Sequence, residues 1–184
     1  MTTGPAADVA RTLCDSAQRE APSRVTEAPA APGLYSWWSS EPELLGIRGT
    51  PQGRAYLYYV GKAEDSLRSR LTTHAHRTTR SSTERFTWAA LGFREFGWIP
   101  GQKRGGKTTR EVLIRDVDEA ALTAWIEVHL EVSWCEHPEP GAVEADVIGL
   151  LKPPLNLDEN VGHPEYAKVK AARAEFRRVA RGGD

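Results

Sequence analysis

Two stretches decide the fold of this chain: GLYSWWS, from Gly33 to Ser39, and AYLYYVGK, from Ala55 to Lys62. Both are rich in aromatic and β-branched residues, which favour extended backbone. The residues 46–53 between them contain glycine and proline, a composition typical of a connection between two antiparallel strands. We therefore predict a β-hairpin with a long connection, whose two strands are central in a sheet.

Helical spacing replaces the strand pattern after Gly61. Asp65 or Ser66 can cap a helix that turns Leu67 and Leu71 inward, and this helix places Arg70 and His74 one turn apart on one face. Similar patterns predict helices at 82–91, 118–130 with Asp118 as the cap, 140–151 and 165–181, and a third strand at 132–135. The third of these helices has the apolar stripe Val143, Val147, Leu150 and Leu151. Residues 97–107 are rich in glycine and basic side chains and predict a flexible loop.

The 184 residues are enough for one compact domain with short appendages. Residues 1–32 are interpreted as an arm or linker with a short helix at 9–19, residues 33–160 as the domain, and residues 161–184 as a basic C-terminal helix. Cys14 and Cys135 lie far apart, which argues against a disulfide framework or a zinc site. The sequence shows no secretion signal and no membrane-spanning run, so we expect a soluble, cytoplasmic protein.

Charge is sorted along the chain, although the formal net charge is only -1. Residues 62–110 contain eleven basic and four acidic side chains, whereas residues 116–165 contain twelve acids and one base. A basic segment of this kind is suited to binding a polyanion, and an arbitrary sorting of charges on a solvated surface is the alternative explanation.

Seven sequence features follow one another in the order found in GIY-YIG nucleases. They are Gly33-Leu34-Tyr35, Tyr59-Val60-Gly61, Lys62, Arg70, His74, Glu144 and Asn156 after Pro153-Pro154. The chain thus resembles the GIY-YIG nuclease superfamily, closest to its restriction-enzyme and repair branches, over about residues 32–160. The resemblance implies an α+β domain with a central three-stranded antiparallel sheet flanked by helices, extended here by N- and C-terminal helices. It also implies metal-dependent hydrolysis of DNA.

The resemblance assigns roles that fit the chemistry of each side chain. Tyr35 or Tyr59 takes a proton from water, with Lys62 and His74 as nearby cations and His74 tuning or relaying. Glu144 offers a hard oxygen ligand to Mg²⁺ or Mn²⁺. Arg70, preferred to Arg68, stabilises charge on the phosphoryl oxygens. Asn156 braces the site.

Basic residues of the middle segment are expected to bind DNA, which is the predicted partner. They are Arg68, Arg77, Arg80, Arg85, Lys103, Arg104 and Lys107. Because no zinc finger or helix-turn-helix module is evident, recognition is expected from the domain itself, from a homodimer or from another protein. A restriction, defence or structure-dependent role fits this better than homing.

Each residue also has an ordinary structural interpretation. A strand tyrosine is usually a packing residue, Arg70 and His74 can be a solvent-facing pair, Glu144 can complement a helix dipole, and Asn156 can be a turn residue. Two other functions stay open for the whole chain. One is a catalytically silent DNA-binding protein of the same fold, and the other is a scaffold that acts on RNA or a small molecule.

Overall fold

The computed structural model describes residues 4–105 and 108–183. The helices are α1 (Pro5–Cys14), α2 (Leu67–His76), α3 (Thr83–Phe96), α4 (Asp116–His129), α5 (Pro140–Leu151) and α6 (Tyr166–Ala180). The strands are β1 (Gly33–Ser39), β2 (Glu43–Leu44), β3 (Ile47–Arg48), β4 (Thr50–Gln52), β5 (Ala55–Ala63), β6 (Pro100–Gly105), β7 (Thr108–Leu113) and β8 (Glu131–Glu136). The short 3-10 helices η1 (Ser16–Gln18) and η2 (Pro22–Glu27) follow α1.

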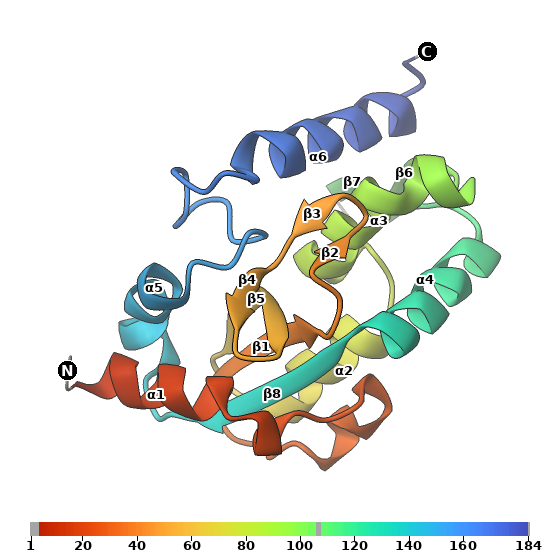
Figure 1. Ribbon diagram of the computed structural model, residues 1–184. Helices are drawn as coiled ribbons and strands as arrows, with labels where there is room; N and C mark the ends of the chain where they lie inside the picture. Colours follow the sequence, from red (N-terminus) through yellow and green to blue (C-terminus); the bar gives the residue numbers. More distant parts are fainter. Residues whose placement is uncertain (1–3, 106–107, 184) are drawn as a thin grey trace.

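The central sheet has the strand order β4-β5-β1-β8 (Figure 1). Strand β1 is antiparallel to both β5 and β8, so the predicted α+β fold with a three-stranded antiparallel sheet is confirmed. The short strand β4 adds a fourth strand beside β5, within the connection that the sequence left unassigned. The predicted bounds of β1 are confirmed, and β5 is one residue longer than predicted.

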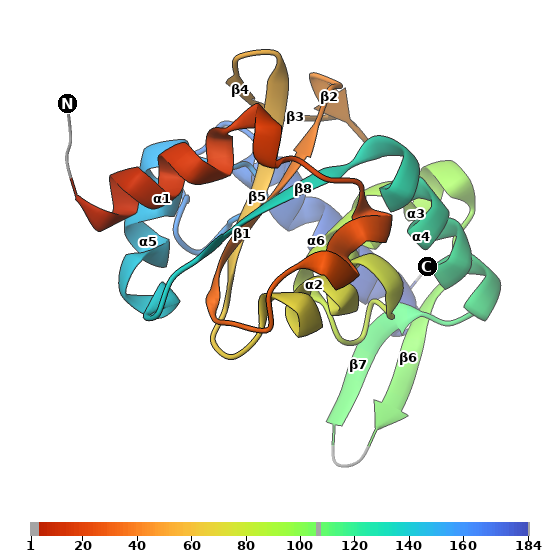
Figure 2. The same ribbon diagram turned by 90° about the horizontal axis from the view of Figure 1, so that it is seen from below.

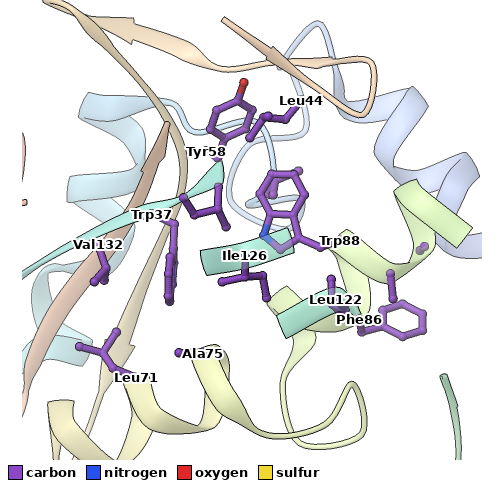
Figure 3. Close-up of a cluster of buried hydrophobic side chains, with 14 of the residues drawn as sticks. Trp37, Leu44, Tyr58, Leu71, Ala75, Phe86, Trp88, Leu122, Ile126 and Val132 are labelled. Carbon is purple, nitrogen blue, oxygen red and sulfur yellow. The ribbon is translucent and has the colours of Figure 1, made fainter. Parts of the chain in front are cut away.

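Each face of the sheet supports its own hydrophobic core. Trp37 of β1 and Tyr58 of β5 pack with Trp88 of α3 and Ile126 of α4 on one face (Figure 3). Leu34 and its neighbours on the other face pack against α1 and α5. The alternation of side chains along β1 therefore divides it between two cores.

A β-bulge separates the two halves of the β1–β5 ladder. Trp37 is paired with Tyr59, but the next residue, Trp38, is paired with Leu57, so Tyr58 is the extra residue on β5. Tyr58 and Tyr59 consequently both contact the first core, although strict alternation would separate them. Regular pairing of Tyr35 with Gly61 and of Trp37 with Tyr59 places Tyr59 on the same face of the sheet as Tyr35, and the bulge adds Tyr58 to that face.

The N-terminal segment is part of the packed structure. Helix α1 starts at Pro5, which occupies the first helical turn, and it ends at Cys14, earlier than the helix expected at 9–19. Val9 and Leu13 are buried against the second core, and α1 lies beside α5 (Figure 1). Much of the stretch interpreted as an arm or linker thus contributes apolar surface to the domain.

The prediction of a flexible loop at residues 97–107 is wrong. Residues 100–105 form β6, which pairs with β7 over six residue pairs in a hairpin that projects from the body of the protein (Figure 2). The glycine-rich, basic residues 100–105 become a strand by pairing with Thr108–Leu113, whose β-branched residues favour extended backbone. Lys103 and Arg104 are exposed on this hairpin, whereas Lys107 lies outside the described residues.

Several helix details also differ from the predictions. Helix α3 extends to Phe96, where Gly97 ends it in the left-handed region. Helix α4 begins at Asp116, and Asp118 is not its cap, because its carboxylate accepts hydrogen bonds from Ile99 N–H and the Arg115 guanidinium. Leu150 is exposed and does not belong to the buried stripe of α5. None of the described helices is both long and apolar enough to cross a membrane.

Candidate active site

An open pocket of about 540 Å³ lies where β1, β5, α2 and α5 meet. Five of the residues predicted from the sequence line it: Tyr35, Tyr59, Lys62, Arg70 and Glu144. The wall is completed by residues for which the sequence predicted no role in the site, namely Ala63, Glu64, Asp65, Ser66, Ser69 and Thr73. The structure thus brings together side chains that are more than 100 positions apart in the chain.

Two glycines of the signature allow this close approach. A Cβ on Gly61 would lie 2.5 Å from the Tyr35 hydroxyl oxygen and 2.8 Å from the Tyr59 ring. A Cβ on Gly33 would lie 2.3 Å from the Cys135 carbonyl oxygen of β8. The rings of Tyr35 and Tyr59 have centroids 6.3 Å apart, with Gly61 between them. These positions need glycine because a side chain would displace a catalytic candidate or the neighbouring strand.

Tyr35 has partners that suit proton transfer. Its hydroxyl lies 2.6 Å from His74 Nε2, and Arg70 Nε donates to the same oxygen at 3.4 Å. Burial, followed by the nearby Tyr59, raises the pKa of Tyr35 well above its ordinary value, although Arg70 opposes the shift. A free Tyr35 phenolate is therefore disfavoured. Tyr35 needs a neighbouring group to accept its proton, and His74 Nε2 is in contact with its hydroxyl.

His74 lies behind Tyr35 and is itself buried. Burial, with Arg70 and Arg85, lowers the pKa of His74 well below its ordinary value, so the ring is neutral. A neutral imidazole can accept a proton at one of its two nitrogens. Nε2 faces Tyr35, and Nδ1 lies 2.6 Å from Ser82 Oγ. The ring is thus held between the tyrosine and the start of α3.

Glu84 is the buried residue of this site that sequence analysis missed. Its Oε2 lies 3.2 Å from His74 Nδ1, and its Oε1 accepts a hydrogen bond from Trp88 Nε1 at 3.3 Å. Burial raises the pKa of Glu84 to about 8, against the opposing effects of Trp88 and Arg85. A glutamate in the first turn of a helix is common for electrostatic reasons alone, so no local sequence signal distinguished this one.

The two arginines of α2 point to different places. Arg70 lines the pocket beside Tyr35, whereas Arg68 Nε donates to the Ala28 carbonyl oxygen at 2.8 Å, outside the pocket. Ser66 caps α2 by accepting a hydrogen bond from Ser69 N–H, which fixes the start of the helix. Of the two, only Arg70 is placed to contact a substrate in the pocket.

Glu144 forms the far wall of the pocket on α5. Lys62 Nζ lies 3.3 Å from its carboxylate and 3.0 Å from that of Glu64. Burial raises the pKa of Glu144, while the Lys62 ammonium opposes the shift. Two carboxylates that share one ammonium show that this part of the pocket favours a cation.

Asn156 lies outside the pocket and supports β5. Its Oδ1 accepts the Val60 N–H at 2.9 Å, and its Nδ2 donates to the Val60 carbonyl at 2.7 Å. Leu155 N–H similarly donates to the Tyr58 carbonyl oxygen. The Pro-Pro-Leu-Asn segment therefore satisfies the outer edge of β5 next to Tyr59.

The residues predicted to contact DNA differ in their accessibility. Arg77, Lys103 and Arg104 are exposed, and Arg80 is half-buried with a hydrogen bond to the Gly105 carbonyl oxygen. Arg85 is wrongly predicted, because it is completely buried and its guanidinium donates to the carbonyl oxygens of residues 74, 75 and 119. It also forms an ion pair with Glu119 at 3.2 Å, so its charge is neutralised inside the domain.

Comparison with known proteins identifies the class to which this fold and pocket belong. The family model described as the GIY-YIG catalytic domain matches residues 33–175. The chain therefore belongs to the GIY-YIG family, which is a family of nucleases. No curated protein matches the chain significantly, and neither does any solved structure.

Proposed function

We propose that the protein is a metal-dependent endonuclease that hydrolyses DNA phosphodiester bonds, in a restriction, defence or structure-dependent role. One observation carries this proposal. A phenol with a proton acceptor (Tyr35), a guanidinium (Arg70) and a carboxylate (Glu144) face one pocket that is open to solvent. These are the three functions that phosphodiester hydrolysis requires.

The donor chemistry of the pocket suits Mg²⁺ or Mn²⁺. Glu144 and Glu64 present hard oxygen ligands, and one or two carboxylates leave room for water and a phosphate oxygen, as Mg²⁺ prefers. Within the described residues no group of three or more His, Cys, Asp or Glu side chains forms a closed metal cage. Glu144 would hold the ion, which supplies Lewis-acid stabilisation of the phosphoryl oxygens.

The chain's own residues supply the remaining steps. Tyr35 takes the proton from the attacking water, because its hydroxyl already contacts His74. Arg70 stabilises the charge that grows on the phosphoryl oxygens, since its planar fork of donors matches a phosphate. Arg77, Lys103 and Arg104 are exposed and hold the DNA backbone, with a strength that falls as salt rises.

The test uses supercoiled plasmid incubated with the full chain and Mg²⁺, Mn²⁺ or a chelator. Nicking or cutting should need the metal and should be lost in Glu144→Ala, while plasmid binding is retained. Asp146→Ala is the matched control, because Asp146 is an exposed acid on the same helix and does not line this pocket. Plasmid that is bound but never cut would favour a silent DNA-binding protein, and plasmid that is neither bound nor cut would favour a different substrate.

A further inference from the structure

The buried groups behind Tyr35 form a continuous chain from the pocket into the core. Tyr35 is 2.6 Å from His74 Nε2, and His74 Nδ1 is 3.2 Å from Glu84 Oε2. All three side chains are almost fully buried. Solvent therefore does not compete for these contacts, and each proton position depends on the neighbouring group.

One buried oxygen in the series Tyr35–His74–Glu84 has no hydrogen-bond partner. Glu84 Oε2 is buried and accepts none from the described residues, although its partner oxygen accepts one from Trp88. A buried carboxylate oxygen without a donor is destabilising, and such atoms are rare in folded proteins. The nearest ring nitrogen is His74 Nδ1, so a proton on this nitrogen would supply the missing donor.

The tautomer of His74 decides whether Tyr35 can lose its proton. If Nδ1 carries the proton, Nε2 is an acceptor for the Tyr35 hydroxyl. If Ser82 Oγ donates to Nδ1 instead, Nε2 carries the proton and cannot accept another. The Ser82 hydroxyl can donate or accept and so fits either tautomer, whereas an ionised Glu84 carboxylate can only accept and therefore favours the proton on Nδ1.

We propose that Glu84 is a positioning residue that, when ionised, holds the His74 proton on Nδ1 and so makes Nε2 the acceptor for the Tyr35 proton. This inference rests on the proposed nuclease function. As the water oxygen forms its bond to phosphorus, its proton goes to the Tyr35 oxygen and the Tyr35 proton goes to Nε2. The bond from phosphorus to the leaving oxygen breaks, and that oxygen takes a proton from solvent. Glu84 stabilises the imidazolium of His74 that has formed. The extra proton of His74 then returns through Tyr35 to solvent.

The charges around Glu84 set the conditions for this role. Arg85 of α3 and Arg70 of α2 face it and favour its ionised form, but burial favours the neutral form more strongly. Besides His74, which contacts Glu84 directly, Tyr59 of β5 and Tyr35 of β1 are titratable groups of this region, and burial raises the pKa of both above the ordinary range. Glu84 therefore ionises before either tyrosine as pH rises, and the cleavage rate should rise with it.

The first measurement is the single-turnover rate of plasmid cleavage against pH, for wild type, Glu84→Gln and Glu84→Asp. Glu84→Gln keeps the size and the Trp88 contact but cannot ionise, so it should lower the rate by about 10²-fold and remove the alkaline rise, with plasmid affinity unchanged. Glu84→Asp should recover part of the rate and retain a pH-dependent rise. Glu95→Gln, an exposed acid on the same helix, should behave like wild type. An unchanged rate and pH profile in Glu84→Gln would overturn the proposal.

The second measurement needs no cleavage. ¹⁵N NMR of the His74 ring in the metal-free, DNA-free protein reports which nitrogen carries the proton. The proton should move from Nε2 to Nδ1 as Glu84 ionises in wild type, and it should stay on Nε2 in Glu84→Gln. The same tautomer in both proteins at alkaline pH would refute the role of Glu84. If the plasmid is never cut, this result still decides the inference while the nuclease function fails separately.

Discussion

Arg70 Nε lies 3.4 Å from the Tyr35 hydroxyl, in the pocket, whereas Arg68 is turned away toward the Ala28 carbonyl oxygen. Only one of the two arginines of α2 can therefore stabilise a phosphoryl group next to the attacking water. Arg70→Lys keeps the charge and loses the planar fork, so we expect the single-turnover rate of plasmid cleavage to fall by about 10²-fold. Arg68→Lys is the matched control and should cleave at nearly the wild-type rate. Equal losses in both variants would contradict this assignment.

The two tyrosines of the pocket should differ in the same assay. Tyr35 contacts a proton acceptor, but no hydrogen bond of this kind connects Tyr59 to His74 within the described structure. Tyr35→Phe should therefore lower the rate by about 10²-fold or more, and Tyr59→Phe should have a clearly smaller effect. Binding of plasmid should be similar in both variants. If Tyr59→Phe is the more damaging change, the proton passes through Tyr59 and not through Tyr35.

Gly61 and Gly149 should respond in opposite directions to the same substitution. A Cβ on Gly61 meets the Tyr35 oxygen at 2.5 Å, so Gly61→Ala should reduce the free energy of unfolding by about 1–3 kcal/mol and abolish cleavage. A Cβ on Gly149, in the interior of α5, meets nothing within 4 Å. Gly149→Ala should therefore stabilise the protein by about 0.5–1 kcal/mol and leave cleavage intact. Urea unfolding measures both changes.

The sequence predicted the three main strands of the central sheet, β1, β5 and β8, but did not predict which charged side chains are buried. The sequence correctly placed Tyr35 and Tyr59 on strands and Arg70 on a helix, because strand composition and helical spacing are local patterns. The burial of Glu84 and Arg85 depends on α3 packing against α2 and α4, which joins residues up to 38 positions apart. Similarly, the β6–β7 hairpin is decided by cross-strand pairing, which a glycine-rich and basic composition does not reveal.

Arg85 and Arg104 provide a direct comparison between a buried and an exposed arginine. Arg85→Met should leave Glu119 partly unpaired and lower the free energy of unfolding by about 3–5 kcal/mol, without a specific effect on the salt dependence of DNA binding. Arg104→Met should change stability by less than about 0.5 kcal/mol, because Arg104 is exposed. If Arg104 contacts a phosphate, its loss should reduce the slope of log K against log salt by about 0.9. An unchanged slope would exclude the hairpin arginine from the DNA interface.

Ionisation of the buried Glu84 should lower the free energy of unfolding over the same pH range in which the cleavage rate rises. Its pKa is raised from an ordinary value of 4.5 to about 8, so between these values the folded protein binds a proton that the unfolded chain has released. Stability due to this group is therefore lost as pH rises. His74, whose pKa is lowered from 6.5, is neutral in both states above about that pH and does not mask the effect. We expect the free energy of unfolding in urea to fall between about pH 6.5 and 8 in wild type, and to change less in Glu84→Gln. Parallel pH curves for the two proteins would show that Glu84 is already ionised at neutral pH, in which case the carboxylate would orient His74 throughout the physiological range.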